Sequence, residues 1–218
     1  MKRMIGFRIF SQPGSWAALC LLLLPLSLPA EQFKTRAESP FRSYSTIEGL
    51  TQSAVTDVAQ DAAGYLWVTT RRGLNRFDGK EFRHYTIANG LPQNFLTAVA
   101  PDQNGTVWVG GGQGEVSLLS GDRFIANRRT DANKRHAVVD MIAGNSVAYV
   151  ATAGGVLYRA RLHTDVIVFD RLFLDSEGIN HLSLRNGALW FVASKGLYRL
   201  TLELGASPEL YSSIVRHN

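Results

Sequence analysis

Three groups of residues in this sequence are of types that could do chemistry. Asp61 and Asp102 stand at matching places in two similar segments, and paired carboxylates can act as general acid and general base. The run Gly110–Gly114 contains four glycines and could cradle a phosphate. Histidines, which could bind a metal ion or transfer protons, stand at His84, His136, His163, His181 and His217.

None of these groups has the partners that its chemistry needs. The histidines lack the spacing of metal ligands, and no serine lies in a nucleophile elbow. The glycine run is not followed by the Lys-Ser/Thr pair or by the helix of a phosphate-binding loop, so we interpret it as a loop between two strands. Asp61 and Asp102 each begin a polar turn, and we expect them to cap it. The sequence therefore predicts no catalytic residue, no metal and no cofactor.

The strongest pattern is an internal repeat. One aromatic residue and one glycine each recur four times at a single constant spacing. The period is about 41 residues, and such regularity over four copies is typical of a repeat protein. The aromatic residues are Trp67, Trp108, Tyr149 and Trp190, and the glycines are Gly73, Gly114, Gly155 and Gly196.

Each repeat has the pattern of four short strands joined by tight turns. Asp78-Gly79 and Asn186-Gly187 are hairpin signals, and β-branched and aromatic residues fill the segments between such turns. Four antiparallel strands in about 40 residues is the size of a propeller blade. We predict an all-β propeller with blades at about 55–85, 96–127, 138–169 and 179–212, in which the repeated aromatic on the second strand fills the space between neighbouring blades.

The segment Phe41–Tyr44 matches Phe82–Tyr85, the fourth strand of the first blade, and is predicted to be a strand. It precedes the first blade, whereas the fourth blade already has a candidate outer strand at Glu209–Tyr211. We therefore expect an open arc of a larger propeller, with further blades beyond Asn218. Exposed apolar flanks would then favour self-association.

The N-terminus has the pattern of a signal peptide over residues 1–30, followed by a linker at 31–40 and the partial propeller at 41–218. Lys2, Arg3 and Arg8 precede an apolar run, and the alternative is an uncleaved anchor. Removing these three charges from the net charge of +5 leaves +2, so the composition does not indicate nucleic-acid binding. Cys20 is the only cysteine and lies within the predicted signal, so no disulfide is expected in the mature chain.

Charged residues divide between the two loop edges of the expected propeller. Asp61, Asp78, Asp102 and Asp122 fall on one edge. Two interpretations of the other, basic edge stay open: solvated loop charges, or a face that attracts an acidic ligand. The candidate ligand-binding residues on that basic edge are Arg71, Arg72, Arg128, Arg129, Lys134, Arg135 and Lys195.

The repeat resembles that of the two-component regulator propeller family. The first unit carries Asp61 and Gly64, then Leu66–Thr70, Gly73-Leu74 and Arg76–Gly79, and it ends on a Gly-Leu-x-x-Asn loop at Gly90–Asn94. The second unit keeps Asp102, Gly105, Trp108–Gly110 and Gly114. The match is specific over 41–124 and weak over 125–212.

This resemblance implies a non-catalytic, periplasmic sensor propeller of a bacterial membrane receptor. The implied output domain is a histidine kinase or a diguanylate cyclase. The implied partners are a small or oligomeric ligand, the remaining propeller blades and the membrane-spanning output domain; the basic edge described above favours an acidic ligand. Two alternatives remain: a secreted propeller enzyme such as a polysaccharide lyase, and a stand-alone interaction scaffold.

Overall fold

The computed structural model describes residues 41–120, 122–129, 136–144, 146–175, 178–202 and 209–213. The predicted signal peptide and linker lie outside these residues. The chain divides into two compact units, Met1–Arg42 and Ser43–Asn218, and every described strand belongs to the second. In the described ranges, no helix has the length and apolar character needed to cross a membrane.

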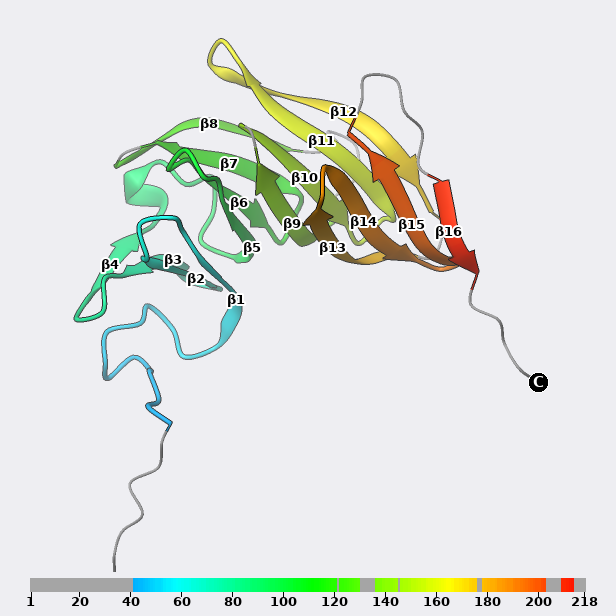
Figure 1. Ribbon diagram of the computed structural model, residues 1–218. Coiled ribbons are helices and arrows are strands. Elements are labelled where there is room, and N and C mark those ends of the chain that lie inside the picture. The colour runs from blue at the N-terminus through cyan, green and yellow to red at the C-terminus, as the bar shows by residue number, and fades with distance from the viewer. Residues whose placement is uncertain are drawn as a thin grey trace, which may run out of the picture. The chain divides into compact units, whose positions relative to one another are not determined.

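In the described part of the chain, sixteen strands form four antiparallel sheets of four strands each (Figure 1). We name the sheets blades one to four in chain order. Blade one contains β1 (Val55–Gln60), β2 (Leu66–Thr70), β3 (Gly73–Phe77) and β4 (Phe82–Tyr85); blade two contains β5 (Leu96–Pro101), β6 (Val107–Gly111), β7 (Glu115–Ser120) and β8 (Arg123–Arg129). Blade three contains β9 (Val138–Gly144), β10 (Val147–Thr152), β11 (Val156–His163) and β12 (Val166–Leu174); blade four contains β13 (Ile179–Arg185), β14 (Ala188–Ala193), β15 (Gly196–Thr201) and β16 (Glu209–Ser213).

The first strand of each blade lies beside the first strand of the next blade. Strands β1, β5, β9 and β13 contact one another in this order, which is the arrangement of propeller blades around an axis. Within the second unit the four blades form an open arc (Figure 1). The predicted all-β propeller fold is confirmed, and the one described helix is η2 (Ile87–Asn89), a single 3-10 turn.

The hydrophobic core lies between the blades because alternate residues of a strand face opposite sides of its sheet. Trp67 packs against Val99 and Val109 of blade two. Trp108 packs in the same way against blade three, and Tyr149 against blade four. These three side chains are nearly fully buried, which confirms the predicted role of the repeated aromatic in blades one to three.

Trp190 is not buried between two of the described blades, as expected for the last blade of an open arc. Leu189 and Phe191, its neighbours on β14, belong to the core between blades three and four. Trp190 therefore faces the other side of its sheet, where no further blade of the described chain packs, and it is half-buried. The position in the repeat is equivalent, but the neighbour that would bury it is not among the described blades.

Two further predictions about local structure need correction. Phe41–Tyr44 is not a strand: it joins none of the described sheets, and instead the Tyr44 ring packs edge-on against Phe77 at 5.0 Å. Gly110 and Gly111 belong to β6 rather than to a loop. A Cβ on Gly110 would lie 2.6 Å from Val138, so glycine is needed there for blade three to approach.

The turn predictions hold. Asp61 Oδ1 accepts hydrogen bonds from the backbone N–H groups of Ala63 and Tyr65, both at 3.0 Å. Asp102 caps its own turn through Asn104 N–H. Its second carboxylate oxygen also accepts the Ser146 N–H of blade three at 2.6 Å, an interblade contact that the sequence did not predict. Asn186 and Gly187 both have positive φ, 51° and 72°, as a type I′ turn requires.

Candidate ligand-binding site

The turns between second and third strands lie on the same edge of the propeller as the connections from one blade to the next. We call this edge the loop face. Short polar contacts hold its turns in place. Thr70 Oγ1 accepts the Arg72 N–H at 3.0 Å and donates to the Gly73 carbonyl. Thr152 caps the turn of blade three by accepting the Val156 N–H. The turns are therefore rigid supports for the side chains that they carry.

One hollow of the loop face, lined by described residues, lies between blades three and four. It has a volume of about 540 Å³. Lys195 and Tyr198 come from blade four, and Phe173 and Asp175 come from the end of β12 and the connection after it. Gly154 and Leu174 complete the lining. The hollow therefore combines one ammonium group with two aromatic rings.

The Asp175 side chain is buried in the wall of this hollow and is hydrogen-bonded within the protein. It is 6% exposed, and both its carboxylate oxygens lie 2.8 Å from Ser194 Oγ, which donates to them. Its backbone N–H donates to the Gly155 carbonyl at 2.8 Å. These bonds join the turn of blade four to the turn of blade three across the hollow. The exposed Lys195 side chain follows Ser194 directly, so its backbone is held by the same contacts.

Two glycines let the chain segments approach closely here. Gly155 has φ +74°, and a Cβ on it would come within 1.7 Å of the Asp175 carbonyl oxygen. A Cβ on Gly154 would lie 2.5 Å from the His136 ring, so His136 covers this turn from the side. The repeated glycine of blade three is therefore required by the path of the connection that builds the hollow.

The structure separates the candidate basic residues instead of gathering them at one point. Arg71 in blade one stacks over the Phe95 ring of the next connection, 5.2 Å from its centroid, and Arg72 is exposed beside it. Arg128 and Arg129 lie within β8, not in the loop after it, because β8 pairs with β7 as far as Glu115. Lys134 and Arg135 lie outside the described residues, and Lys195 stands at the hollow. Ligand binding by these seven residues stays a prediction.

A second polar feature lies on the innermost strands, toward the propeller axis. The Asp57 carboxylate accepts the Val99 N–H of blade two at 2.8 Å and the Val58 N–H at 2.8 Å. Asp140 repeats this contact by accepting the Leu182 N–H of blade four at 2.7 Å. His181 Nδ1 lies 3.0 Å from the same Asp140 oxygen. Each carboxylate therefore links its blade to the next one.

Sequence reasoning missed both the hollow and the interblade carboxylates. Asp57, Ala98, Asp140 and His181 occupy equivalent positions of the four first strands, one in each repeat, so an alignment of the repeats could have found the carboxylates. Phe173 and Tyr198 had no comparable signal, because they come from different blades and meet only after folding.

Burial raises the pKa of Asp57 above its ordinary value of 3.8, and the negative charge of Asp140 adds to this, against the opposing effect of the two N–H donors. A carboxyl whose pKa is higher in the folded than in the unfolded protein contributes most stability when protonated. We expect the stability that Asp57 contributes to fall as pH rises through its raised pKa. Urea unfolding of Asp57→Asn and of the unaltered protein, from below pH 3.8 to above the raised pKa of Asp57, measures the free energy of unfolding of each. The free energy of the variant is expected to lack the fall with pH that Asp57 causes. Identical pH profiles of the two proteins would contradict the raised pKa.

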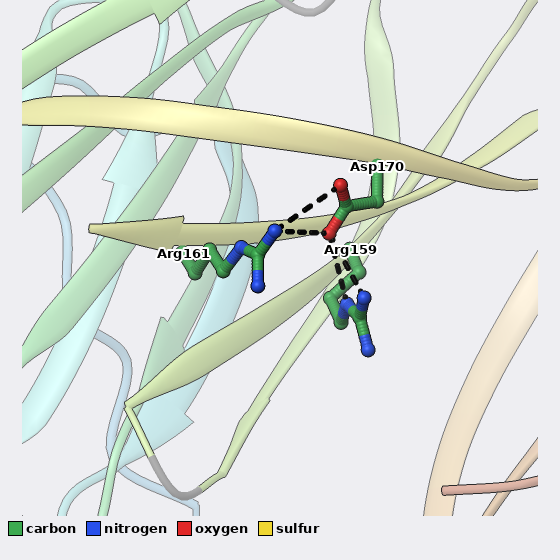
Figure 2. A network of polar contacts seen from close by, with 3 residues as sticks. All are labelled: Arg159, Arg161 and Asp170. Atoms are coloured by element: carbon green, nitrogen blue, oxygen red, sulfur yellow. Dashed lines mark hydrogen bonds and ion pairs between the residues drawn. The ribbon is translucent and has the colours of Figure 1, made fainter. Parts of the chain in front are cut away.

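An ion-pair network on blade three lies apart from the loop face. Figure 2 shows Asp170 of β12 between two arginines of β11, Arg159 at 2.9 Å and Arg161 at 3.2 Å. Arg159 also pairs across the sheet with Tyr149, whose pKa is raised by burial and lowered in part by the Arg159 charge. The three residues hold outer strands together and are about one-third to one-half exposed. In the described ranges, no three histidine, cysteine, aspartate or glutamate residues gather as metal ligands would.

Comparison with known proteins finds a family whose repeats match two segments of this chain. The two-component regulator propeller family matches residues 49–72 and 90–113. The first segment contains β1 and β2, and the second contains β5 and β6. Histidine kinase P4 of Formosa agariphila is 42% identical over 66 residues, which are 30% of this chain and 4% of that protein. The chain thus spans only a small part of this curated relative.

Solved structures share the fold. The extracellular domain of a putative hybrid two-component system from B. thetaiotaomicron aligns with a TM-score of 0.63 and 16% identity, over 77% of this chain and 23% of that one. Virginiamycin B lyase from Staphylococcus aureus aligns with a TM-score of 0.58 and 16% identity, over 72% of this chain and 55% of that one. These structural similarities establish the propeller architecture. The chain is therefore a β-propeller protein, and segments of its first two repeats match the two-component regulator propeller family.

Proposed function

We propose that this chain is the extracytoplasmic ligand-sensing part of a two-component signalling receptor and has no catalytic role of its own. The observation that carries the proposal is the hollow of the loop face, where Lys195, Phe173 and Tyr198 of two blades converge. The family match and the likeness to an extracellular domain of a hybrid two-component system support the receptor context. The N-terminal signal pattern supports a periplasmic location.

The lining of the hollow favours an anionic ligand with flat apolar faces. The Lys195 ammonium can pair with a carboxylate, while aromatic rings offer apolar surface to the rest of the ligand. A carboxylated oligosaccharide has both features. Asp175 is buried and accepts hydrogen bonds from Ser194 Oγ, so Lys195 is the exposed charged side chain among the described lining residues.

Binding of such a ligand is expected to depend on Lys195. An oligogalacturonate serves as the probe, and calorimetry measures its affinity. Lys195→Gln is expected to weaken binding by about tenfold or more, since a hydrogen bond to a charged group contributes roughly 1.5–3 kcal/mol. The affinity of the unaltered protein is also expected to fall with added salt, because screening weakens exposed charge pairs.

Lys80→Gln is the matched control. Lys80 lies in the turn between β3 and β4, on the opposite edge of the blades, so its loss is expected to leave the affinity unchanged. A neutral oligosaccharide of equal length is expected to bind at least tenfold more weakly. Equal affinity of the Lys195→Gln and unaltered proteins for the acidic probe, or no binding of either probe, would overturn the proposed site.

The two alternative functions have less support. A propeller lyase appears among the structural relatives, but at 16% identity that likeness concerns the fold alone. A catalytic site would need an acid and a base converging on a cleft, whereas the carboxylate at this hollow is occupied by Ser194. An interaction scaffold would use the loop face for a protein partner, and binding of the small acidic probe would argue against it.

A further inference from the structure

We propose a second binding site, on the edge of blade one opposite the loop face, that takes a free α-amino acid as a zwitterion. The site is a hollow of about 420 Å³ beside the hairpin of β3 and β4, and we call it the hairpin hollow. The inference goes beyond the proposed sensing role, because it does not depend on the hollow at Lys195. The described lining of the hairpin hollow consists of Arg76, Asp78, Glu81, Phe82 and Arg83.

The cationic part of the hairpin hollow is a pair of arginines on neighbouring strands. Arg76 of β3 and Arg83 of β4 are direct partners in the strand register, so their side chains lie on the same face of the sheet. Like charges in such a cross-strand pair repel each other. A bound carboxylate would lie close to both guanidinium groups and offset this repulsion.

The Arg76 guanidinium is held in place by aromatic rings rather than by a carboxylate of the protein. It lies over the Tyr65 ring, 4.5 Å from the centroid, and over the Trp67 ring at 5.8 Å. Its Nε is buried and has no hydrogen-bond partner in the described part of the chain. Arg83, in contrast, forms an ion pair with Asp122 of blade two at 2.7 Å. Arg76 is therefore a positioned guanidinium whose bonding capacity the described residues leave unused.

The anionic part of the hollow lies two residues farther along each strand, toward the turn. Asp78 follows β3 and Glu81 precedes β4, and both are exposed. Asp78 Oδ1 accepts the N–H groups of Glu81 and Lys80, both at 2.8 Å. These bonds lower the pKa of Asp78 below its ordinary value of 3.8, so its carboxylate is charged at neutral pH. The hairpin thus places a pair of carboxylates beside the pair of arginines.

This arrangement fits a zwitterion better than a simple anion. Two residues of an extended chain span roughly 7 Å, a gap that the two charged groups of a small ligand can bridge. An inorganic anion would meet the arginines but would be repelled by the carboxylates. An α-amino acid offers its carboxylate to Arg76 and its ammonium group to Asp78 and Glu81, and both contacts are charge-assisted hydrogen bonds. Phe82 adds apolar surface for an apolar side chain of the ligand.

The hairpin hollow lies at a junction between two described blades and not on an outer flank. Trp67, the partner of Arg76 in the register of β2 and β3, packs against Val99 of blade two. The ion pair of Arg83 with Asp122 joins the same two blades nearer the turns. The face of blade one that carries the two arginines is therefore already covered by blade two, and the hollow remains beside this contact.

The test measures binding of L-phenylalanine by calorimetry and compares it with two analogues that each lack one charged group. Hydrocinnamate lacks the ammonium group, and phenethylamine lacks the carboxylate. The unaltered protein is expected to bind L-phenylalanine about tenfold more tightly than either analogue, or better, because each analogue loses hydrogen bonds to charged groups. Each analogue also leaves one pair of like charges in the hollow unmatched.

Removing the two carboxylates is expected to affect the ligands in opposite directions. Asp78→Asn combined with Glu81→Gln keeps the shapes of both side chains and the oxygen that caps the turn. The double variant is expected to bind L-phenylalanine about tenfold more weakly, but to bind hydrocinnamate more tightly than the unaltered protein does, because the repulsion is gone. Arg76→Gln is expected to weaken binding of L-phenylalanine to a similar degree without weakening that of phenethylamine.

Asp165→Asn is the control, since Asp165 is exposed in the turn between β11 and β12 of blade three, and it is expected to leave all three affinities unchanged. Circular dichroism melts verify that each variant is folded. If Arg76→Gln is unfolded because it loses its ring contacts, the double variant decides the test.

Three results would overturn the proposal. One is no binding of L-phenylalanine by the unaltered protein. Another is equal affinity for L-phenylalanine and hydrocinnamate, which would indicate a site for simple anions. The third is binding of L-phenylalanine that the folded double variant retains in full, which would place the amino acid elsewhere on the protein.

Discussion

Trp108→Ala is expected to lower the free energy of unfolding by about 3–5 kcal/mol, the usual cost of removing a fully buried large aromatic side chain. Trp108 is 1% exposed and packs between blades two and three, against Val138 and Met141. Its loss would leave a cavity that rigid sheets on both sides cannot close. Urea unfolding monitored by circular dichroism measures the change.

Trp190→Ala is the matched control, since it removes the same side chain from the equivalent position of blade four. Trp190 is half-buried on an outer flank, so its removal is expected to cost well under half as much. Equal losses for the two variants would contradict the assignment of Trp108 to an interblade core and of Trp190 to an open flank.

Gly155→Ala is expected to have an effect of similar size, about 3–5 kcal/mol, which lies above the usual range of roughly 0.5–3 kcal/mol for single substitutions. Two causes combine. The residue has φ +74°, and its new Cβ would come 1.7 Å from the Asp175 carbonyl oxygen. The connection after β12 would have to move, which would break the Asp175 N–H bond to Gly155 and displace the wall of the hollow.

Gly187→Ala separates the two causes. Gly187 has nearly the same φ, +72°, but a Cβ there meets no atom within 4 Å. It therefore carries only the left-handed backbone cost, roughly 1–2 kcal/mol. Thermal unfolding of the two variants measures the difference, which is expected to be about 1–4 kcal/mol, with Gly187→Ala the more stable variant. Equal destabilisation would mean that the Asp175 connection adapts without cost.

The strands and turns of this protein could be predicted from the sequence because their causes are local. Alternating β-branched and aromatic residues form strands wherever they occur, and Asn186-Gly187 adopts a left-handed turn whatever surrounds it. The regular repetition of these signals along the chain predicted four blades of four strands, and the family resemblance came from the same short motifs. Strand ends were less well defined, as β8 shows by continuing through Arg128 and Arg129.

What surrounds each residue was decided only by the tertiary structure. Trp67 and Trp190 have the same type and repeat position, yet Trp67 is 4% exposed and Trp190 is half-buried. Their surroundings differ because burial in a propeller depends on the next blade, which lies a full repeat away along the chain. Phe41–Tyr44 likewise has the residues of a strand but joins none of the described sheets. The hollow at Lys195 needs side chains from two blades, so it exists only when packing between sheets brings those distant residues together.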